Sequence, residues 1–119
     1  MKIFLDDERE TPSGYSRVYD IVAAIGLIRT QEHERDLAWL YYLSGWIDRD
    51  EFDRRLNSSL IEEISCDNDL GEHEAEGYKL LDWLEATGRN IPIRIHSANP
   101  VARQRMQAII QRNGWTEVK

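Results

Sequence analysis

Three short segments of this chain each run from an apolar stretch directly into polar side chains. Their sequences are IFLDDE at residues 3–8, ISCDND at residues 64–69 and IRIHSAN at residues 93–99. Short apolar runs are typical of buried strands, and the carboxyl ends of parallel strands face one crevice of a sheet. We therefore expect the polar side chains that follow these strands to meet at one site. They are Asp6, Asp7, Asp67, Asp69, His96, Ser97 and Asn99.

Expected strands and helices alternate between these segments. A second strand is expected at 15–19, a helix begins after the capping residue Asp20, and a later helix covers about 78–87. Asn99 and Pro100 are suited to the N-cap and first position of a last helix, which a short edge strand follows. This alternation indicates parallel βαβ units. The predicted fold class is α/β, with about five mostly parallel strands and helices on both faces of the sheet.

Residues 31–58 are charged, but their apolar side chains recur at helical spacing. The spacing predicts two short helices joined near Gly45, which form a helical hairpin inserted into the α/β unit. The 119 residues have the size of one domain, so we expect a single domain over residues 1–119.

The composition places the chain among globular proteins. Hydrophobic residues make up 41% and charged residues 31%, unlike a disordered tail. No stretch approaches the about 18 apolar residues of a membrane span, and the sequence opens on a strand rather than a signal peptide. We therefore expect no membrane partner and a cytoplasmic location. The lone Cys66 is expected to pack as a small hydrophobe.

The net charge of −7 is unevenly distributed. Residues 89–119 contain six cationic side chains against Glu117 alone, a net charge of +5, which leaves −12 for residues 1–88. Such a balance argues against a binder of duplex nucleic acid with one broad basic face. A small anionic ligand fits the charge distribution better.

The acidic residues suggest a metal site. Asp6, Asp7 and Asp67 at adjacent strand ends would supply hard oxygen ligands, which suit Mg²⁺ or Mn²⁺ better than zinc. Crowded carboxylates repel one another, so without a cation at least one of them should have a raised pKa. Asp67 and Asp69 would point the same way in extended chain, so one could bind the ion while the other orients it. The structural alternative is that Asp6 and Asp7 merely cap a turn.

His96, Ser97 and Asn99 form the opposite wall of the expected site. A histidine at a strand end can act as a general acid or base, or it can bind a metal. The N–H groups at the start of the following helix, with Arg103 in its first turn, suit a phosphate or another oxyanion. The structural alternative is that Asn99 serves only as an N-cap.

These residues carry a resemblance. The Asp pair, the later Asp and the SerAla dipeptide resemble the acidic pocket of response-regulator receiver domains, whose flavodoxin-like fold is a three-layer sandwich. Four ordered motifs resemble the cyclic-phosphate-processing receiver-like family more closely, over about residues 1–30 and 60–115. They are LDDER at 5–9 with Pro12, SCDNDLG at 65–71, GYKLLDWL at 77–84, and HSANP at 96–100 with Arg103 and Met106.

The resemblance implies a receiver-derived pocket that binds or hydrolyses a cyclic phosphate on a nucleotide or an RNA end. By position, the metal ligands would be Asp6, Asp7 and Asp67, and the catalytic group would be His96, Asp69 and Asp67. The phosphate-binding residues would be Ser97, Asn99 and Arg103. The chain departs from the family in two places, because Asn68 stands where members often have His and Ala102 where they often have Gly.

Three functions of different classes remain open at this point. The first is a metal-dependent phosphoesterase that acts on a cyclic phosphate. The second is a signalling receiver in which Asp67 accepts a phosphoryl group and Ser97 reports it, with only Lys119 available as the lysine that receivers need. The third is a module that sequesters a nucleotide or binds a protein partner through residues 31–58. Its contact residues would be Trp39, Tyr41, Tyr42 and Trp46.

Overall fold

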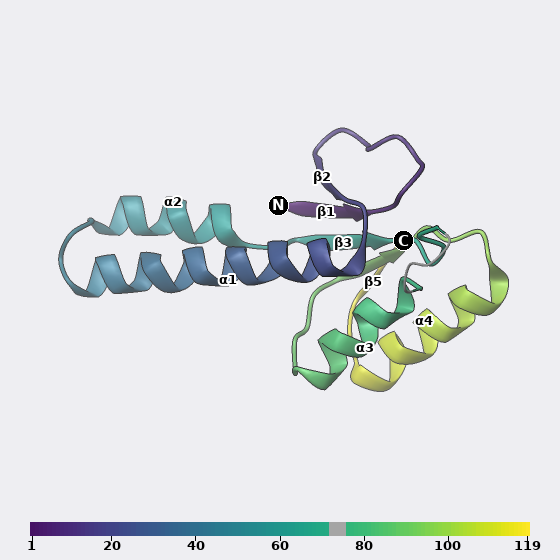
Figure 1. Ribbon diagram of the computed structural model, residues 1–119. Helices are drawn as coiled ribbons and strands as arrows, with labels where there is room; N and C mark the ends of the chain where they lie inside the picture. The colour runs from purple at the N-terminus through teal and green to yellow at the C-terminus, as the bar shows by residue number, and fades with distance from the viewer. Residues whose placement is uncertain (72–75) are drawn as a thin grey trace.

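A five-stranded parallel sheet forms the centre of the computed structural model, which describes residues 1–71 and 76–119 (Figure 1). Its strand order is β2-β1-β3-β4-β5, which is the flavodoxin-like order of receiver domains. The strands are β1 (Lys2–Leu5), β2 (Tyr15–Val18), β3 (Glu63–Cys66), β4 (Ile93–Ile95) and β5 (Glu117–Val118). The helices are α1 (Ile21–Leu43), α2 (Arg49–Ser59), α3 (Tyr78–Ala86) and α4 (Pro100–Asn113). The predicted α/β fold class is confirmed.

The register of the sheet aligns the carboxyl ends of its central strands. Leu5 pairs with Cys66, and Cys66 pairs with Ile95. Each of the next residues along the chain continues the hydrogen bonding of the sheet. The N–H of Asp6 donates to Val18, that of Asp67 to Leu5 and that of His96 to Cys66, over 3.2, 3.0 and 3.1 Å. The main chain therefore fixes where the first polar residue after each strand lies.

One face of the sheet carries the hydrophobic core. Ile3, Leu5 and the strand residues aligned with them pack with buried residues of α1, α3 and α4 in a single cluster. The connections from β2 to β3, β3 to β4 and β4 to β5 all advance in the same direction across the sheet, so right-handed crossovers place their helices on one face.

The expectation of helices on both faces is wrong for the residues that the structure describes. A helix that joined β1 to β2 would lie on the second face, because the direction across the sheet reverses there. This connection is instead the loop 6–14, in which Pro12 and Gly14 disfavour a helix and Gly14 has φ of 87°. The described helices that connect the strands therefore lie on one side of the flavodoxin-like sheet.

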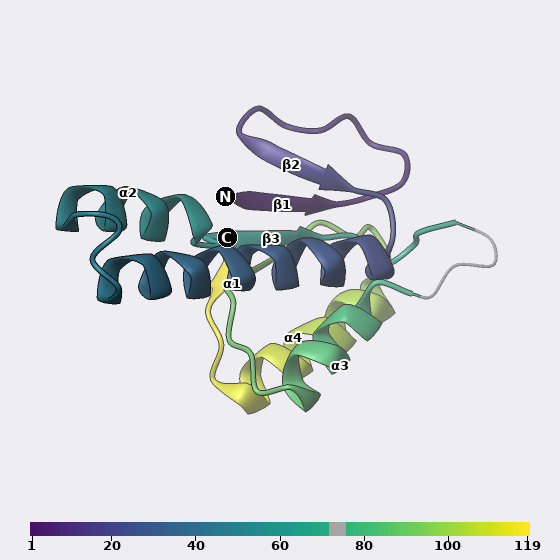
Figure 2. The same cartoon turned by 60° about the vertical axis from the view of Figure 1, so that its left-hand side comes forward.

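The predicted helical hairpin forms, but its first helix is longer than expected. α1 is a single helix of 23 residues, so the helix expected after Asp20 and the first helix of residues 31–58 are continuous. No Gly or Pro interrupts residues 27–43, which explains the continuity. After the turn at Gly45, α2 returns along α1, and the pair projects away from the sheet (Figure 2). Phe52 of α2 stacks on Tyr42 of α1 and packs edge-on against Trp39.

Other sequence expectations fit the structure. α3 spans nearly the predicted residues 78–87, α4 begins at the predicted Pro100, and Cys66 is fully buried in the core. Within the described part of the chain, no helix has the length and apolar character needed to cross a membrane.

Candidate functional site

Asp6, Asp67 and His96 meet at the carboxyl edge of the sheet. They follow β1, β3 and β4, and one ligand atom from each lies within 4.8 Å of the other two. Asp6 is fully buried, whereas Asp67 and His96 are partly exposed. The convergence predicted from the three strand ends is therefore present for these residues.

Both oxygens of the Asp6 carboxylate have hydrogen-bond partners. Its Oδ1 accepts hydrogen bonds from the N–H groups of Glu8 and Arg9 at 2.8 and 2.9 Å, so Asp6 does cap the turn, as the structural alternative held. Its Oδ2 lies 2.9 Å from Nε2 of His96. Burial by itself raises the pKa of Asp6, but these N–H donors and His96 bring it below the ordinary value. Asp6 is therefore ionised at neutral pH, with one oxygen directed into the cluster.

The imidazole of His96 is held from several directions. Nδ1 lies 2.8 Å from the hydroxyl oxygen of Ser65, and the ring stacks on Phe4 with 4.8 Å between centroids. The Arg9 guanidinium donates to the backbone oxygen of His96 at 2.9 Å. Burial lowers the pKa of His96 in spite of the nearby carboxylates, so the ring is neutral at neutral pH.

A neutral imidazole has one donor and one acceptor nitrogen. The ionised Asp6 can only accept, so hydrogen-bond chemistry assigns the proton to Nε2 and leaves Nδ1 to accept from the Ser65 hydroxyl. Sequence reasoning missed Ser65, Phe4 and Arg9. Period-two alternation could have found the first two, because they precede Cys66 and Leu5 and so face away from the core, on the side of His96.

Of the two carboxylates in the cluster, Asp67 is the one whose negative charge is less well compensated. Its Oδ1 accepts a hydrogen bond from the N–H of Asn68 at 2.9 Å. Burial, and then the nearby charge of Asp6, raise the pKa of Asp67. The sequence predicts a raised pKa for one of the crowded carboxylates in the absence of a cation, and Asp67 is that carboxylate. A bound cation would relieve the repulsion between Asp6 and Asp67.

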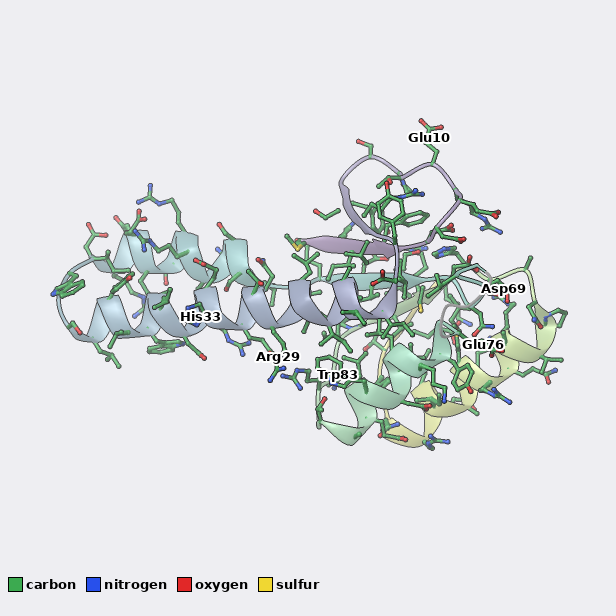
Figure 3. All side chains as sticks on the ribbon, in the orientation of Figure 1. Glu10, Arg29, His33, Asp69, Glu76 and Trp83 are labelled. Atoms are coloured by element: carbon green, nitrogen blue, oxygen red, sulfur yellow. The ribbon has the colours of Figure 1, made fainter. Side chains whose placement is uncertain are left out.

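Asp7 and Asp69 lie outside this group of three, among the residues that the structure describes. Asp69 is exposed beside the end of the sheet (Figure 3), and its Oδ1 accepts from the side chain of Asn68 at 3.4 Å. The strand ends at Cys66 and the chain bends at Asn68, so the extended geometry that would align Asp67 with Asp69 is not maintained. The side chain of Asp7 lies close to Gly71 in the loop after β3.

Asn68 and Gly77 fix the loop that carries Asp67. The buried Asn68 accepts from the N–H of Gly77 at 2.7 Å through its backbone oxygen and from that of Tyr78 at 3.3 Å through its side chain. A Cβ at position 77 would overlap the backbone oxygen of Asp67. A glycine is therefore needed there for close approach to the site loop.

Ser97, Asn99 and Arg103 build the turn from β4 into α4. The Asn99 side chain accepts from the N–H groups of Val101 and Ala102 at 3.0 and 3.2 Å, so Asn99 is the N-cap of α4. Ser97 Oγ accepts from the N–H of Asn99, and Arg103 donates to the backbone oxygens of Ile95 and Ser97. The structure thus gives all three a positioning role, and their contact with phosphate stays a prediction.

Comparison with known proteins places this site in a family context. A family model described as the cyclic-phosphate processing receiver domain matches residues 46–112. This range includes Asp67 and His96, whereas Asp6 and Asp7 lie before it. A search of curated proteins and a search of solved structures each found no match. Because the model matches more than half of the chain, the protein belongs to the cyclic-phosphate processing receiver domain family.

Proposed function

We propose that this chain binds and hydrolyses a cyclic phosphate, on a nucleotide or an RNA end, at Asp6, Asp67 and His96 with the aid of Mn²⁺ or Mg²⁺. The observation that carries the proposal is the convergence of two carboxylates and an imidazole at the carboxyl edge of the sheet. Membership of the cyclic-phosphate processing family supports the class of substrate.

The donor set fits a divalent cation. Asp6 and Asp67 offer carboxylate oxygens, the ligands that Mg²⁺ and Mn²⁺ prefer. Asp6 is already oriented by other groups, as is usual for a ligand of a metal site. The ion would supply positive charge that stabilises negative charge developing on the phosphate.

His96 is the proposed proton carrier. Hydrolysis opens the ring when water adds to phosphorus, the bond from phosphorus to one ester oxygen breaks, and that oxygen gains a proton. Nε2 already carries a proton, so Nδ1 is the nitrogen that would accept a proton from the water, in place of its hydrogen bond from Ser65, and return it to the departing oxygen. Asp6 would hold the ring in position, and the exposed Asp69 stays a second acid/base candidate.

The phosphate is proposed to lie against the start of α4. Ser97, Asn99 and Arg103 hold the β4–α4 turn rigid, and the positive end of the α4 dipole favours an anion there. Arg103 adds a formal positive charge in the first turn. Asp7 stays a proposed further metal ligand because it follows Asp6 directly.

The test combines titration calorimetry with turnover assays. The ligands are 2′,3′-cyclic and 3′,5′-cyclic nucleotides with Mn²⁺ or Mg²⁺, and the variants are Asp67→Asn and His96→Ala. His33→Ala and Asp36→Asn are matched controls because both residues are exposed on α1, and Figure 3 shows His33 well apart from Asp69. We expect turnover to fall by about 10²-fold or more in the site variants, the typical contribution of a general acid or base, and to be unchanged in the controls.

Other outcomes would separate the alternatives. Metal-dependent binding without turnover would indicate a sequestering module and would contradict hydrolysis. Modification by acetyl phosphate at Asp67 would indicate a phosphoacceptor receiver. Little in the structure favours the receiver, since the Lys119 side chain is 80% exposed and pairs with Glu117 at 3.1 Å.

A protein partner at the hairpin is the remaining candidate, and exposed apolar side chains at its tip support it. Leu43 is 75% and Trp46 77% exposed, whereas Trp39 and Tyr42 also pack on Phe52. If no cyclic nucleotide binds, the variants Leu43→Ser and Trp46→Ser test this contact, and both leave α1 uninterrupted. Binding of a protein partner that uses the tip should be lost in both variants.

A further inference from the structure

A cavity lies at the opposite end of the strands from Asp6, Asp67 and His96. Its volume is about 500 Å³, and it opens where the α1–α2 hairpin leaves the sheet. Leu60 and Ile61 line it just before β3 begins, and Ile91 lines it just before β4 begins. The acidic cluster follows the other ends of these strands, so the two places are separated by the length of the sheet.

The walls of this cavity combine an apolar floor with a polar rim. The buried Ile28 and Ile91 form part of the floor, and the partly exposed Trp39 forms part of one side. Gln31 and Asn90 stand among the polar lining residues. Volumes of about 300–1,000 Å³, lined by apolar groups with a few polar ones, are typical of sites for small organic molecules.

The charge of the lining is positive in a chain whose net charge is −7. Among the described residues, the lining has Arg35 and Arg89 against Glu32, a net charge of +1. Both oxygens of Glu32 are engaged by Arg89 at 2.8 Å, which joins α1 to the loop before β4. The same guanidinium lies over the ring of Trp83, 4.4 Å from its centroid. Glu32 is therefore compensated, and the guanidinium of Arg35 gives the rim its positive charge.

We propose that this cavity is a binding site for a small organic anion with an aromatic or branched apolar body. The apolar body would rest on Ile28, Ile91 and Trp39, and the anionic group would lie at the rim beside Arg35. Because the walls come from α1, α2 and the loop before β4, such a ligand would connect the hairpin to the sheet. The site is separate from the proposed cyclic-phosphate chemistry and stands without it.

The probe for this site is 8-anilinonaphthalene-1-sulfonate, an aromatic sulfonate, added to the full chain in a calorimetric titration. We expect one molecule bound per chain, with weaker binding in Trp39→Phe, which removes part of the aromatic wall. Reversal of the rim charge in Arg35→Glu should weaken binding about 3- to 10-fold, as expected for one partly screened charge contact. Arg35 is exposed on α1, so this variant should keep the fold, which circular dichroism checks.

Three control variants distinguish this site from other places on the chain. Arg54→Glu changes an arginine on the same hairpin outside the lining, and Trp46→Phe removes the exposed tryptophan of the hairpin tip. Asp67→Asn alters the acidic cluster. All three should bind the probe as the unmodified chain does. The proposal is overturned if Arg54→Glu weakens binding as much as Arg35→Glu, if Trp39→Phe keeps the full affinity, or if several molecules bind per chain. Changed affinity in Asp67→Asn, in particular tighter binding after loss of a negative charge, would place the anionic probe at the acidic cluster and would equally overturn it.

Discussion

Oδ2 of Asp6 lies 2.9 Å from Nε2 of His96, although 90 residues separate the two in the chain. The contact joins the end of β1 to the end of β4 across the intervening β3. Its partners are fixed independently, Asp6 by the turn N–H groups and His96 by Ser65 and Phe4. This pair is therefore held in place before any ligand arrives.

Ser65→Ala should disturb His96 without removing it. The variant loses the hydroxyl that accompanies Nδ1, so we expect a loss of about 1 kcal/mol in the free energy of unfolding and a changed tautomer signature in the ¹⁵N spectrum of His96. Ser58→Ala is the control, because the hydroxyl of Ser58 donates to the backbone oxygen of Arg54 within α2 and not to the site. An unchanged ¹⁵N spectrum in Ser65→Ala would argue that Ser65 does not orient the ring.

Gly77→Ala should damage the site through the backbone. The added Cβ would overlap the Asp67 backbone oxygen, so the loop must move and metal affinity should fall. Gly26→Ala is the matched control within α1, since its Cβ would meet open space. We expect that control to gain about 0.5–1 kcal/mol of stability, because alanine favours a helix interior. Equal metal affinity in Gly77→Ala and the unmodified chain, measured by calorimetry, would contradict the close approach.

Mn²⁺ should stabilise the folded chain. A ligand that binds only the folded state adds about 2.7 kcal/mol at one hundred times its dissociation constant, which appears as a higher Tm. Asp67→Asn should lose most of this increase, whereas Asp36→Asn on the exposed side of α1 should keep it. EDTA should reverse the shift. A Tm increase that persists in Asp67→Asn would place the ion elsewhere.

Glu63 should make stability depend on pH. Burial by itself raises the pKa of Glu63, but hydrogen bonds from Arg94 and Tyr15 and the charge of Lys2 bring it below the ordinary 4.5. A carboxylate with a lowered folded pKa stabilises the fold above its unfolded pKa, and this stabilisation is lost as the pH falls below about 4.5 toward the folded value.

Glu63→Gln should consequently unfold at lower urea concentration than the unmodified chain at pH 7. The expected loss is about 1–2 kcal/mol, since solvent screens the 36% exposed Arg94 side chain. The variant should also show a shallower loss of stability between pH 5 and pH 3. Glu62→Gln, at an exposed neighbouring position, should follow the unmodified chain at both pH values. Identical pH profiles for Glu63→Gln and the unmodified chain would exclude this contribution.

The convergence of Asp6, Asp67 and His96 was predictable because each is the first polar residue after a strand of a parallel sheet. The cap at Asn99 was predictable because it depends on local residue types. By contrast, the direction of Asp69 depends on where β3 ends, and local composition does not mark that point. The role of Ser65 depends on which strand lies beside β3. The loop 6–14 joins β1 to β2 without a helix, and its proline and glycine predicted a turn; that this turn leaves one face of the sheet without a helix there follows only from the strand order.

The N–H groups of Asp6, Asp67 and His96 each donate to the neighbouring strand. The site residues are therefore part of the cooperative unit that unfolds with the sheet, and fraying of a surface loop does not release them. Their amide hydrogens should exchange with solvent as slowly as those of the core strands. Assembly of the cluster is in this way coupled to formation of the sheet, and the capacity to hold an ion depends on the strands being paired.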